Sequence, residues 1–180
     1  KVTGDAMEVR GGCGFIEEWS DARIVRDAHL GSIWEGTSNI VALDVIRAVE
    51  RAEALPDLKA YLLHLVSHEK IPAISRQVLT HKLLEVEQFI LNIVAEKNQS
   101  DTRKAASALY NICTAIMMAW EAVQLEDHWQ RLAWAHLVIK YKLSPVHPFA
   151  RDHNTQLDVV LSTLIQQDSV NLEQAMSIIA

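Results

Sequence analysis

The sequence predicts an all-α protein whose helices pack as a bundle behind a glycine-rich N-terminal edge. All six glycines lie at or before Gly36, and all four prolines lie beyond it. No stretch of useful length alternates polar and apolar residues with the period of two that marks a β-strand. Large apolar residues instead step by four and three along one segment, at Leu79, Leu83, Val86, Ile90 and Ile93. Such a line predicts a long helix that packs along a partner helix.

The composition is that of a globular protein with a sizeable core. Of the 180 residues, 49% are hydrophobic, which argues against a disordered chain. The net charge of −6 is spread evenly, with five basic and eight acidic side chains in residues 1–47 and twelve and fifteen in the remainder. An acidic chain without a basic stripe repels the phosphates of nucleic acids. We therefore do not expect a nucleic-acid partner.

The cellular setting is predicted from the start of the chain and its thiols. No apolar run approaches the ~20 residues of a membrane span, so we expect no membrane association. The first residues, Lys1-Val2-Thr3, are neither an initiator methionine nor a signal peptide, and we expect a trimmed start. Cys13 and Cys113 lie a hundred residues apart and predict free thiols in a reducing compartment. Cys13 is interpreted as a small filler, because no basic neighbour adjoins it to activate the thiol.

The first elements of the chain are a glycine turn and a short helix. Gly11, Gly12 and Gly14 place three glycines in four positions, which predicts a tight turn where backbone meets backbone or a ligand. Residues 22–28 follow as a short helix with Arg23 and Arg26 on one side. The simplest interpretation of these arginines is a solvated or salt-bridged face.

The stretch around Glu35 is the most informative part of the sequence. Glu35 is followed by Gly36 and then by three short polar residues that are all good N-cap residues, Thr37, Ser38 and Asn39. Apolar residues at helical spacing come next, at Ile40, Leu43 and Ile46. The first turn of such a helix attracts a phosphate, and Gly36 would let a ligand approach the backbone closely. The alternative is an ordinary loop followed by a capped helix.

The helices of the second part are placed by proline and by apolar spacing. The helix that begins at Ser38 or Asn39 should run to about residue 54, where Pro56 ends it or begins the next. A short helix is expected at 57–67. After the long helix through Leu79 and Ile93, a polar break at 96–102 predicts an antiparallel turn. The apolar line of the returning helix is assigned to Leu109, Cys113, Ile116, Trp120 and Val123.

Three further helices complete the predicted bundle. One passes through Leu132, His136, Ile139 and Leu143 and ends near Pro145. Another begins with Leu157, Val160, Leu161 and Leu164. Asn171, with Gln174 three residues later, predicts the capped start of a last helix that ends at Ala180.

Other candidate sites are weaker. His64 and His68 have the spacing of a zinc pair on one helix face, but no third ligand is evident, so we predict no metal. A group of aromatic and histidine side chains is best explained by core packing or an oligomer interface. This group consists of His128, Trp129, Trp134 and His136. Met117 and Met118 are interpreted as core filling.

Taken together, the N-terminal motifs resemble the C-terminal domain of flavin-dependent acyl-CoA dehydrogenases. The resemblance covers roughly the first quarter of the chain and is specific, because several motifs agree in order and separation. The matching segments are Glu8-Val9-Arg10-Gly11-Gly12-Cys13-Gly14-Phe15, residues 23–28, Trp34-Glu35-Gly36-Thr37-Ser38-Asn39-Ile40 and Leu43-Asp44-Val45-Ile46-Arg47. The pattern looks closest to the adaptive-response and isovaleryl-CoA-dehydrogenase-like branch, whose adaptive-response members are linked to protection against DNA alkylation.

The resemblance implies a catalytic role for Glu35. Glu35 matches the family's base, which takes a proton from the carbon alpha to the thioester while hydride leaves the beta carbon for flavin N5. Gly36 and Arg47 match substrate-side positions. Some family members place the base on a different helix, and the presence of Glu35 argues against that arrangement here.

The resemblance also implies contacts with FAD. Thr37, Ser38 and Asn39 match a segment that contacts the cofactor. A second segment matches one that reaches the FAD of a neighbouring subunit, and it comprises Glu8, Val9, Arg10, Gly11 and Gly12. Most members carry glutamine where this chain has Glu8, and a carboxylate near a pyrophosphate is repulsive unless it is protonated or paired.

These implications combine into a functional expectation. Residues 1–54 would be the end of the catalytic domain, and 55–180 a helical extension packed as a bundle. The chain would be part of an FAD-dependent acyl-CoA dehydrogenase, inactive alone, that uses acyl-CoA and an electron-transfer flavoprotein and forms a dimer or tetramer. We expect it in the cytoplasm, or in the mitochondrial matrix of a eukaryote. The alternatives are an adaptive-response protein that protects DNA and a helical oligomerisation module.

Overall fold

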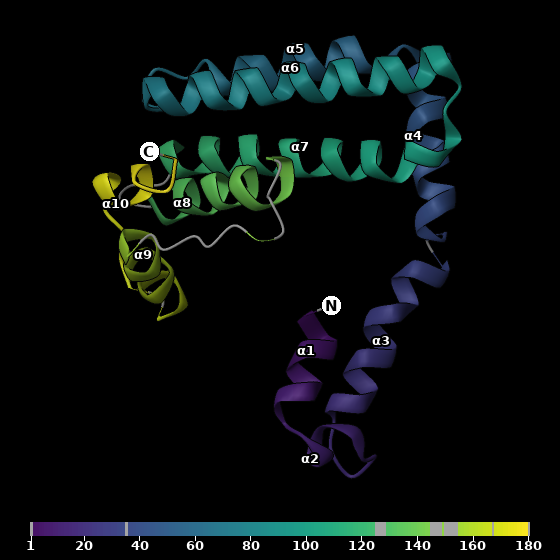
Figure 1. The fold of residues 1–180 in the computed structure, drawn as a ribbon, viewed down its shortest axis with the longest axis vertical. Helices are drawn as coiled ribbons and strands as arrows, with labels where there is room; N and C mark the ends of the chain where they lie inside the picture. Colours follow the sequence, from purple (N-terminus) through teal and green to yellow (C-terminus); the bar gives the residue numbers. More distant parts are fainter. Residues whose placement is uncertain are drawn as a thin grey trace. The chain divides into compact units, whose positions relative to one another are not determined.

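The computed structural model consists of helices, and the described residues contain no strand (Figure 1). It describes residues 2–34, 36–124, 129–144, 149, 155–166 and 168–179. The all-α prediction is therefore confirmed. Two compact units divide the chain, Lys1–Asp44 and Val45–Ala180, and each is described by itself. The expected boundary at residue 54 stays a prediction.

The first unit is built from short helices around a glycine turn. Its elements are α1 (Val2–Val9), α2 (Gly12–Phe15), α3 (Asp21–Trp34) and the beginning of α4 (Ser38–Ala52). The glycine turn is confirmed: the Gly11 N–H donates to the Glu8 carbonyl over 2.9 Å, and Gly11 adopts φ +58°. Gly14 is buried, and a Cβ there would collide with the Met7 carbonyl oxygen. Backbone therefore meets backbone at this turn.

Surface contacts of the first unit agree with one sequence interpretation and correct another. Arg26 forms a two-point ion pair with Glu17, with N···O distances of 2.7 and 2.9 Å. Arg23 lies 3.7 Å from Asp27, so both arginines lie on a salt-bridged face, as expected. Cys13 is exposed, so its interpretation as a filler is wrong. The buried position of this turn is the neighbouring Gly14, which packs on the Met7 backbone and has no side chain.

The second unit is a helical bundle with α7 at its centre. It contains the end of α4, then α5 (Ala54–Val66), α6 (Ala73–Glu96), η1 (Gln99–Asp101), α7 (Thr102–Gln124), α8 (Trp129–Val138), η2 (Ile139–Leu143), α9 (Thr155–Ile165) and α10 (Leu172–Met176). Helix α7 packs against α6, α5, α8 and η2, and α10 packs on α8. Figure 1 shows α6 and α7 running side by side in opposite directions, as predicted.

Local signals explain where these helices begin and end. Helix α5 starts at Ala54, earlier than expected, because Pro56 is tolerated in the first turn of a helix, where its missing N–H is not needed. Helix α6 ends at Glu96 and is capped by Lys97, which adopts φ +52°, while the Asn98 N–H donates to the Ile93 carbonyl over 3.1 Å. This closed end turns the chain back toward α7.

The C-terminal cap is confirmed, although its helix is short. Asn171 and Gln174 form the predicted capping box, with N···O distances of 2.8 and 3.0 Å. The α-helix ends at Met176 rather than at Ala180, which lies outside the described residues, as do Pro145 and His128.

The predicted apolar line of α6 is confirmed, because Leu79, Leu83, Val86, Ile90 and Ile93 are all buried. The line assigned to α7 is confirmed in part: Ile116 is buried, Leu109, Cys113 and Val123 pack against the core, and Trp120 is the position that is wrong. Trp120 is 36% exposed, and the fully buried positions are mostly small. They are Ala105, Ile112, Ala115, Ile116, Ala119 and Ala122. A helix that packs on several sides needs small side chains for close approach, so its large residues lie toward the edges.

The neighbouring assignments on α7 and α8 are confirmed in part, and Met117 is corrected. Met117 is 50% exposed, whereas Met118 packs against the core as predicted. On α8, Trp129 packs against the core and Trp134 is 41% exposed. His136 is fully buried. Only part of the aromatic group is therefore core.

Helix α7 also bears on the membrane prediction. By length and composition the segment Gln99–Gln124 could cross a membrane, which the sequence analysis does not expect. The core helix of a soluble protein passes the same test. Within the second unit α7 packs against α6 and α8, and its alanine and isoleucine side chains Ala105, Ile112, Ala115, Ile116, Ala119 and Ala122 are buried, but only 28% of the apolar window is buried.

Candidate functional site

The predicted base, Glu35, lies outside the described residues, and the site is therefore built from its neighbours. Helix α3 ends at Trp34, whose side chain is 79% exposed. Gly36 adopts φ +94°, a backbone conformation that side-chain-bearing residues rarely adopt. A Cβ at Gly36 would meet only ordinary contacts, at 3.7 Å from Val41 Cγ2. The backbone angle, rather than lack of space, therefore requires glycine here.

The start of α4 exposes the groups expected of an anion site. Thr37, Ser38 and Asn39 are exposed, and the Thr37 carbonyl accepts the Val41 N–H over 3.0 Å. The N–H groups before Val41 in this first turn have no acceptor within the helix. The first turn contains no acidic residue, so the positive end of the helix dipole is not neutralised locally. This end of α4 is suited to a phosphate or another anion.

The segment from Glu8 to Gly12 forms the turn between α1 and α2. Glu8 and Val9 end α1, and Val9 is 88% exposed. Gly12 begins α2. Arg10 is held within the unit, because its Nε lies 3.1 Å from Asp21 Oδ2 and its guanidinium lies 5.2 Å from the centre of the Trp19 ring. The arginine therefore already has an anionic and an aromatic partner.

A cavity of about 600 Å³ adjoins this turn within the first unit. It is lined by Thr3, Gly4, Asp5, Met7, Glu8, Gly11, Phe15 and His29. Two of the predicted site residues, Glu8 and Gly11, thus share a cavity, whereas Gly36 and residues 37–39 are not part of its lining. Asp5 and Glu8 bring two carboxylates to the cavity, and these disfavour a pyrophosphate.

Arg47 is exposed on the part of α4 that belongs to the second unit. The structure therefore gathers Glu8 to Gly12 around one turn and Gly36 to Asn39 around the start of one helix. The roles assigned to all of these residues stay predictions.

No group of three or more metal-ligating side chains occurs among the residues that the structure describes. His68 lies beyond the end of α5, and its Nδ1 accepts the Lys70 N–H over 3.3 Å. His64 is in the last turn of α5. The two histidines therefore do not share one helix, as the zinc-pair spacing requires.

The second unit contains a buried polar cluster that no sequence motif indicates. His136 Nε2 lies 3.0 Å from Ser75 Oγ, and His136 Nδ1 lies 2.8 Å from the Ala175 carbonyl oxygen. A carbonyl oxygen can only accept a hydrogen bond, so Nδ1 carries the hydrogen and donates to Ala175. The unprotonated Nε2 accepts a hydrogen bond from the Ser75 hydroxyl. Ser75 and His136 are both fully buried, so no substrate reaches them. The cluster joins α6, α8 and α10 and is structural.

The electrostatics of His136 follow from its burial. Burial lowers the pKa of His136, and the hydrogen bond to Ala175 offsets part of this lowering. The apolar spacing of α8 correctly places His136 inside. Its partners are 61 and 39 residues away along the chain, and no local sequence pattern could indicate them.

We expect the second unit to lose stability as the pH falls through the ordinary histidine range. Above the unfolded pKa of about 6.5, His136 is neutral in both states. At lower pH the unfolded chain binds a proton that the folded protein does not, which favours unfolding until the pH reaches the folded pKa. Urea denaturation from about pH 7.5 to about pH 5 measures this loss.

His136→Gln should reduce the pH dependence, and His64→Gln, which changes an exposed histidine, should retain it. Equal pH dependence in the parent and His136→Gln would contradict the assignment.

Comparison with known proteins connects the first unit to one family. Residues 1–50 match the family model described as "Acyl-CoA dehydrogenase, C-terminal domain". AidB of Escherichia coli (strain K12), named provisionally as an acyl-CoA dehydrogenase, is 44% identical over 54 residues, 30% of this chain and 10% of AidB. Butyryl-CoA dehydrogenase of Syntrophomonas wolfei is 34% identical over 74 residues, 39% of this chain and 12% of that protein. No solved structure gives a significant match.

Two of these matches are too long for residues 1–54 and include part of the helical extension, namely the match of 74 residues and a third match of 132 residues. Acyl-CoA dehydrogenase family member 11 of Caenorhabditis elegans is 24% identical over 132 residues, 71% of this chain and 21% of that protein. This match is longer than residues 1–50 and must include part of the second unit. The chain spans about a tenth to a fifth of the length of these relatives. AidB belongs to the adaptive-response branch, in agreement with the motif pattern. Residues 1–50 thus match the C-terminal domain of the acyl-CoA dehydrogenase family, in agreement with the resemblance that the motifs indicate.

Proposed function

We propose that this chain supplies the C-terminal part of an FAD-dependent acyl-CoA dehydrogenase, which forms an alpha,beta double bond in an acyl-CoA thioester. The observation that carries the proposal is the family match over residues 1–50, which contains Glu35 and the start of α4. FAD, when bound, would accept the hydride that leaves the beta carbon. The chain's own contribution would be the base, part of the cofactor contacts and part of the substrate side.

Glu35 would hold the proton taken from the alpha carbon. The backbone at Gly36, which follows it, adopts φ +94°, so glycine serves both the turn and the close approach of a substrate. Arg47 would lie on the substrate side, where a guanidinium suits the phosphates of a CoA thioester. These roles rest on the motif match and on the backbone geometry around residue 36.

The exposed start of α4 fits a role toward FAD. Thr37, Ser38 and Asn39 offer hydroxyl, amide and backbone N–H donors at the positive end of a helix dipole. The segment from Glu8 to Gly12 fits less well, because Asp5 and Glu8 place two carboxylates beside it. A contact between this segment and a pyrophosphate therefore needs a neutralising partner.

The proposal includes partners and a compartment. An electron-transfer flavoprotein would reoxidise the flavin, and the enzyme would be a dimer or tetramer. Free Cys13 and Cys113 suit a reducing compartment, namely the cytoplasm or, in a eukaryote, the mitochondrial matrix.

A nucleic-acid role is the second candidate, and the similarity to AidB in the adaptive-response branch is the observation in its favour. The net charge of −6 opposes it, because binding to nucleic acid depends on clustered basic residues. A titration with duplex DNA over a range of salt concentrations separates the two candidates. Tight binding that weakens steeply with added salt would favour the nucleic-acid role.

Flavin retention tests the proposal directly. The 180-residue chain alone should be folded and helical but should not retain FAD, because it offers only one edge of the site. A longer protein that joins this sequence to a flavin-binding β-domain should retain FAD stoichiometrically, as measured by flavin absorbance after gel filtration.

In that longer protein, Thr37→Val should weaken retention, because the hydroxyl at the start of α4 is lost. Thr155→Val, at the start of α9, is the matched control and should retain FAD like the parent. Stoichiometric FAD on the short chain, or equal retention in both variants, would contradict the assignment.

A further inference from the structure

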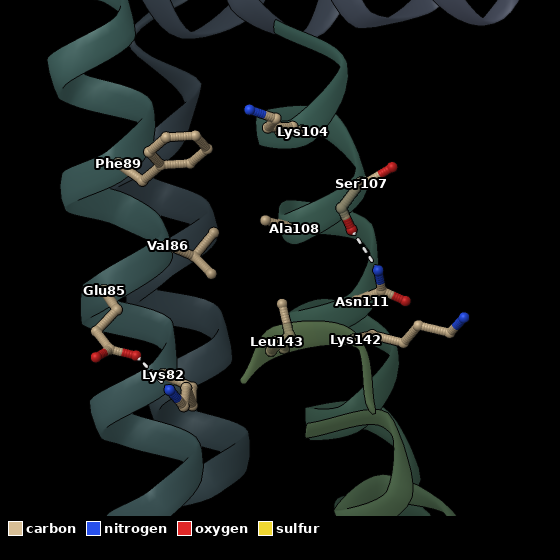
Figure 2. A pocket seen from close by; sticks show the side chains of 10 residues that line it. All are labelled: Lys82, Glu85, Val86, Phe89, Lys104, Ser107, Ala108, Asn111, Lys142 and Leu143. Atoms are coloured by element: carbon tan, nitrogen blue, oxygen red, sulfur yellow. Dashed lines mark hydrogen bonds and ion pairs between the residues drawn. The ribbon is translucent and has the colours of Figure 1, made fainter. Parts of the chain in front are cut away.

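A groove in the second unit combines an apolar floor with basic side chains. It has a volume of about 420 Å³ and lies between α6, α7 and η2 (Figure 2). Its lining consists of Lys82, Glu85, Val86, Phe89, Lys104, Ser107, Ala108, Asn111, Lys142 and Leu143. All of these residues lie outside residues 1–50, which match the dehydrogenase family model and contain the residues of the proposed flavin contacts.

The floor of the groove is apolar. Figure 2 shows Val86 and Phe89 pointing from α6 toward Ala108 of α7, with Leu143 reaching into the same space. Val86 is buried, and Phe89, Ala108 and Leu143 are partly buried against the core. The small side chain of Ala108 leaves room between the two helices. An apolar group placed there would be removed from water on several sides.

The charge of the lining is predominantly positive. The lining contains three lysines, Lys82, Lys104 and Lys142, and a single carboxylate, Glu85. The Lys82 side chain is only 16% exposed, and its Nζ lies 2.7 Å from Glu85 Oε2. An ammonium group can donate three hydrogen bonds, and Glu85 takes one of those of Lys82 among the described residues. Lys82 can therefore bind a second anionic group through its ammonium group, on a side chain that is largely shielded from water.

The other two lysines strengthen the positive potential. Lys104 is 76% exposed, and its Nζ lies 2.7 Å from Asp101 Oδ1. Lys142 is also exposed, and in Figure 2 its chain extends away from the gap between α6 and α7. They attract an anion to the groove, whereas the partly covered Lys82 is positioned to bind it.

We propose that this groove binds a small amphipathic anion, with a carboxylate head at Lys82 and an apolar body on the floor formed by Val86, Phe89, Ala108 and Leu143. A compact, fully hydrated anion would leave the floor in contact with water. A neutral apolar molecule would not accept a hydrogen bond from the Lys82 ammonium group. The volume of about 420 Å³ is within the range of small-molecule sites.

Three probes separate the contributions of head and body: octanoate, 1-octanol and acetate. Titration of the 180-residue chain, followed by amide chemical shifts in NMR spectra, should show saturable binding of octanoate at one site. Shifts should be centred on α6, α7 and η2. Octanol and acetate should each bind at least about tenfold more weakly, because each lacks one of the two contacts. Equal binding of octanol and octanoate, or no saturable octanoate binding, would overturn the proposal.

Variants locate the two contacts. Lys82→Met should weaken octanoate binding several-fold and leave octanol unchanged, and Ala108→Leu should abolish octanoate binding by filling the floor. Arg103→Gln removes an exposed charge from α7 outside the groove and is the matched control. Lys104→Gln changes an exposed side chain and should not affect folding. It therefore tests the contribution of the lysine charges to octanoate binding even if Ala108→Leu fails to fold. Parent-like octanoate affinity in both lysine variants would overturn the assignment.

Discussion

Replacing Ile90 with aspartate is expected to unfold the helical bundle of the second unit. Ile90 is fully buried on the side of α6 that packs into the core. The substitution removes an apolar side chain whose burial stabilises by about 1.5–3 kcal/mol. It also places a carboxylate among the apolar side chains of the core, and an unpaired buried charge costs a further several kcal/mol. The sum is comparable with the ~5–15 kcal/mol that stabilises a typical domain.

Thermal denaturation followed by far-ultraviolet circular dichroism measures this effect, and Leu91→Asp is the matched control. Leu91 is the next residue on the same helix but is 43% exposed, so its aspartate remains hydrated. The control should melt close to the parent, whereas Ile90→Asp should show no cooperative transition. A melting temperature within a degree or two of the parent for Ile90→Asp would show that the buried line of α6 is misassigned.

In a protein that contains this chain together with the flavin-binding domains, Glu35→Gln should lower the rate of flavin reduction by acyl-CoA by several orders of magnitude. A hydrated carboxylate is a weak base toward a carbon acid, so the site must dehydrate Glu35 and hold it beside the substrate. Glutamine has nearly the same size but cannot accept the proton. Stopped-flow measurement of flavin bleaching gives the rate.

Flavin binding should survive in Glu35→Gln, because the proposed FAD contacts belong to Thr37, Ser38 and Asn39. Glu18→Gln changes an exposed carboxylate of the first unit and should reduce its flavin at the parent rate. If Glu35→Gln also reduced its flavin at nearly the parent rate, the base would lie on another helix. Loss of flavin from Glu35→Gln would instead assign the residue a structural role.

The fold could be predicted from the sequence wherever large apolar side chains mark the buried face. The line from Leu79 to Ile93 on α6 is the clearest example, because all five of its large apolar residues are buried. On α7 the same approach selects Trp120, which lies toward the surface. Small residues such as Ala115 and Ala119 take the interior, since several helices approach α7 closely. An alanine carries little information about burial, so this face is hard to identify before the neighbours are known.

Only those parts of the candidate site that are formed by residues close together in the sequence could be predicted. The start of α4 and the turn at Gly11 are local features, and both are found where the motifs place them. The acidic cavity beside Glu8 depends on His29 and Asp5 from two different helices, and its lining is not a sequence pattern. The cluster around His136 is still less local, because its partners come from α6 and α10.

The alanine face of α7 has a consequence for the stiffness of the bundle. Folding immobilises side chains, and the entropy lost is substantial for long residues but close to zero for alanine, which has no rotamers to lose. Ala105, Ala115, Ala119 and Ala122 therefore pack the centre of the bundle without this entropic cost. The same lack of rotamers means that the face cannot adjust when a neighbouring helix shifts. We expect α6, α7 and α8 to move as one rigid element, with conformational entropy retained mainly by the large side chains at their edges.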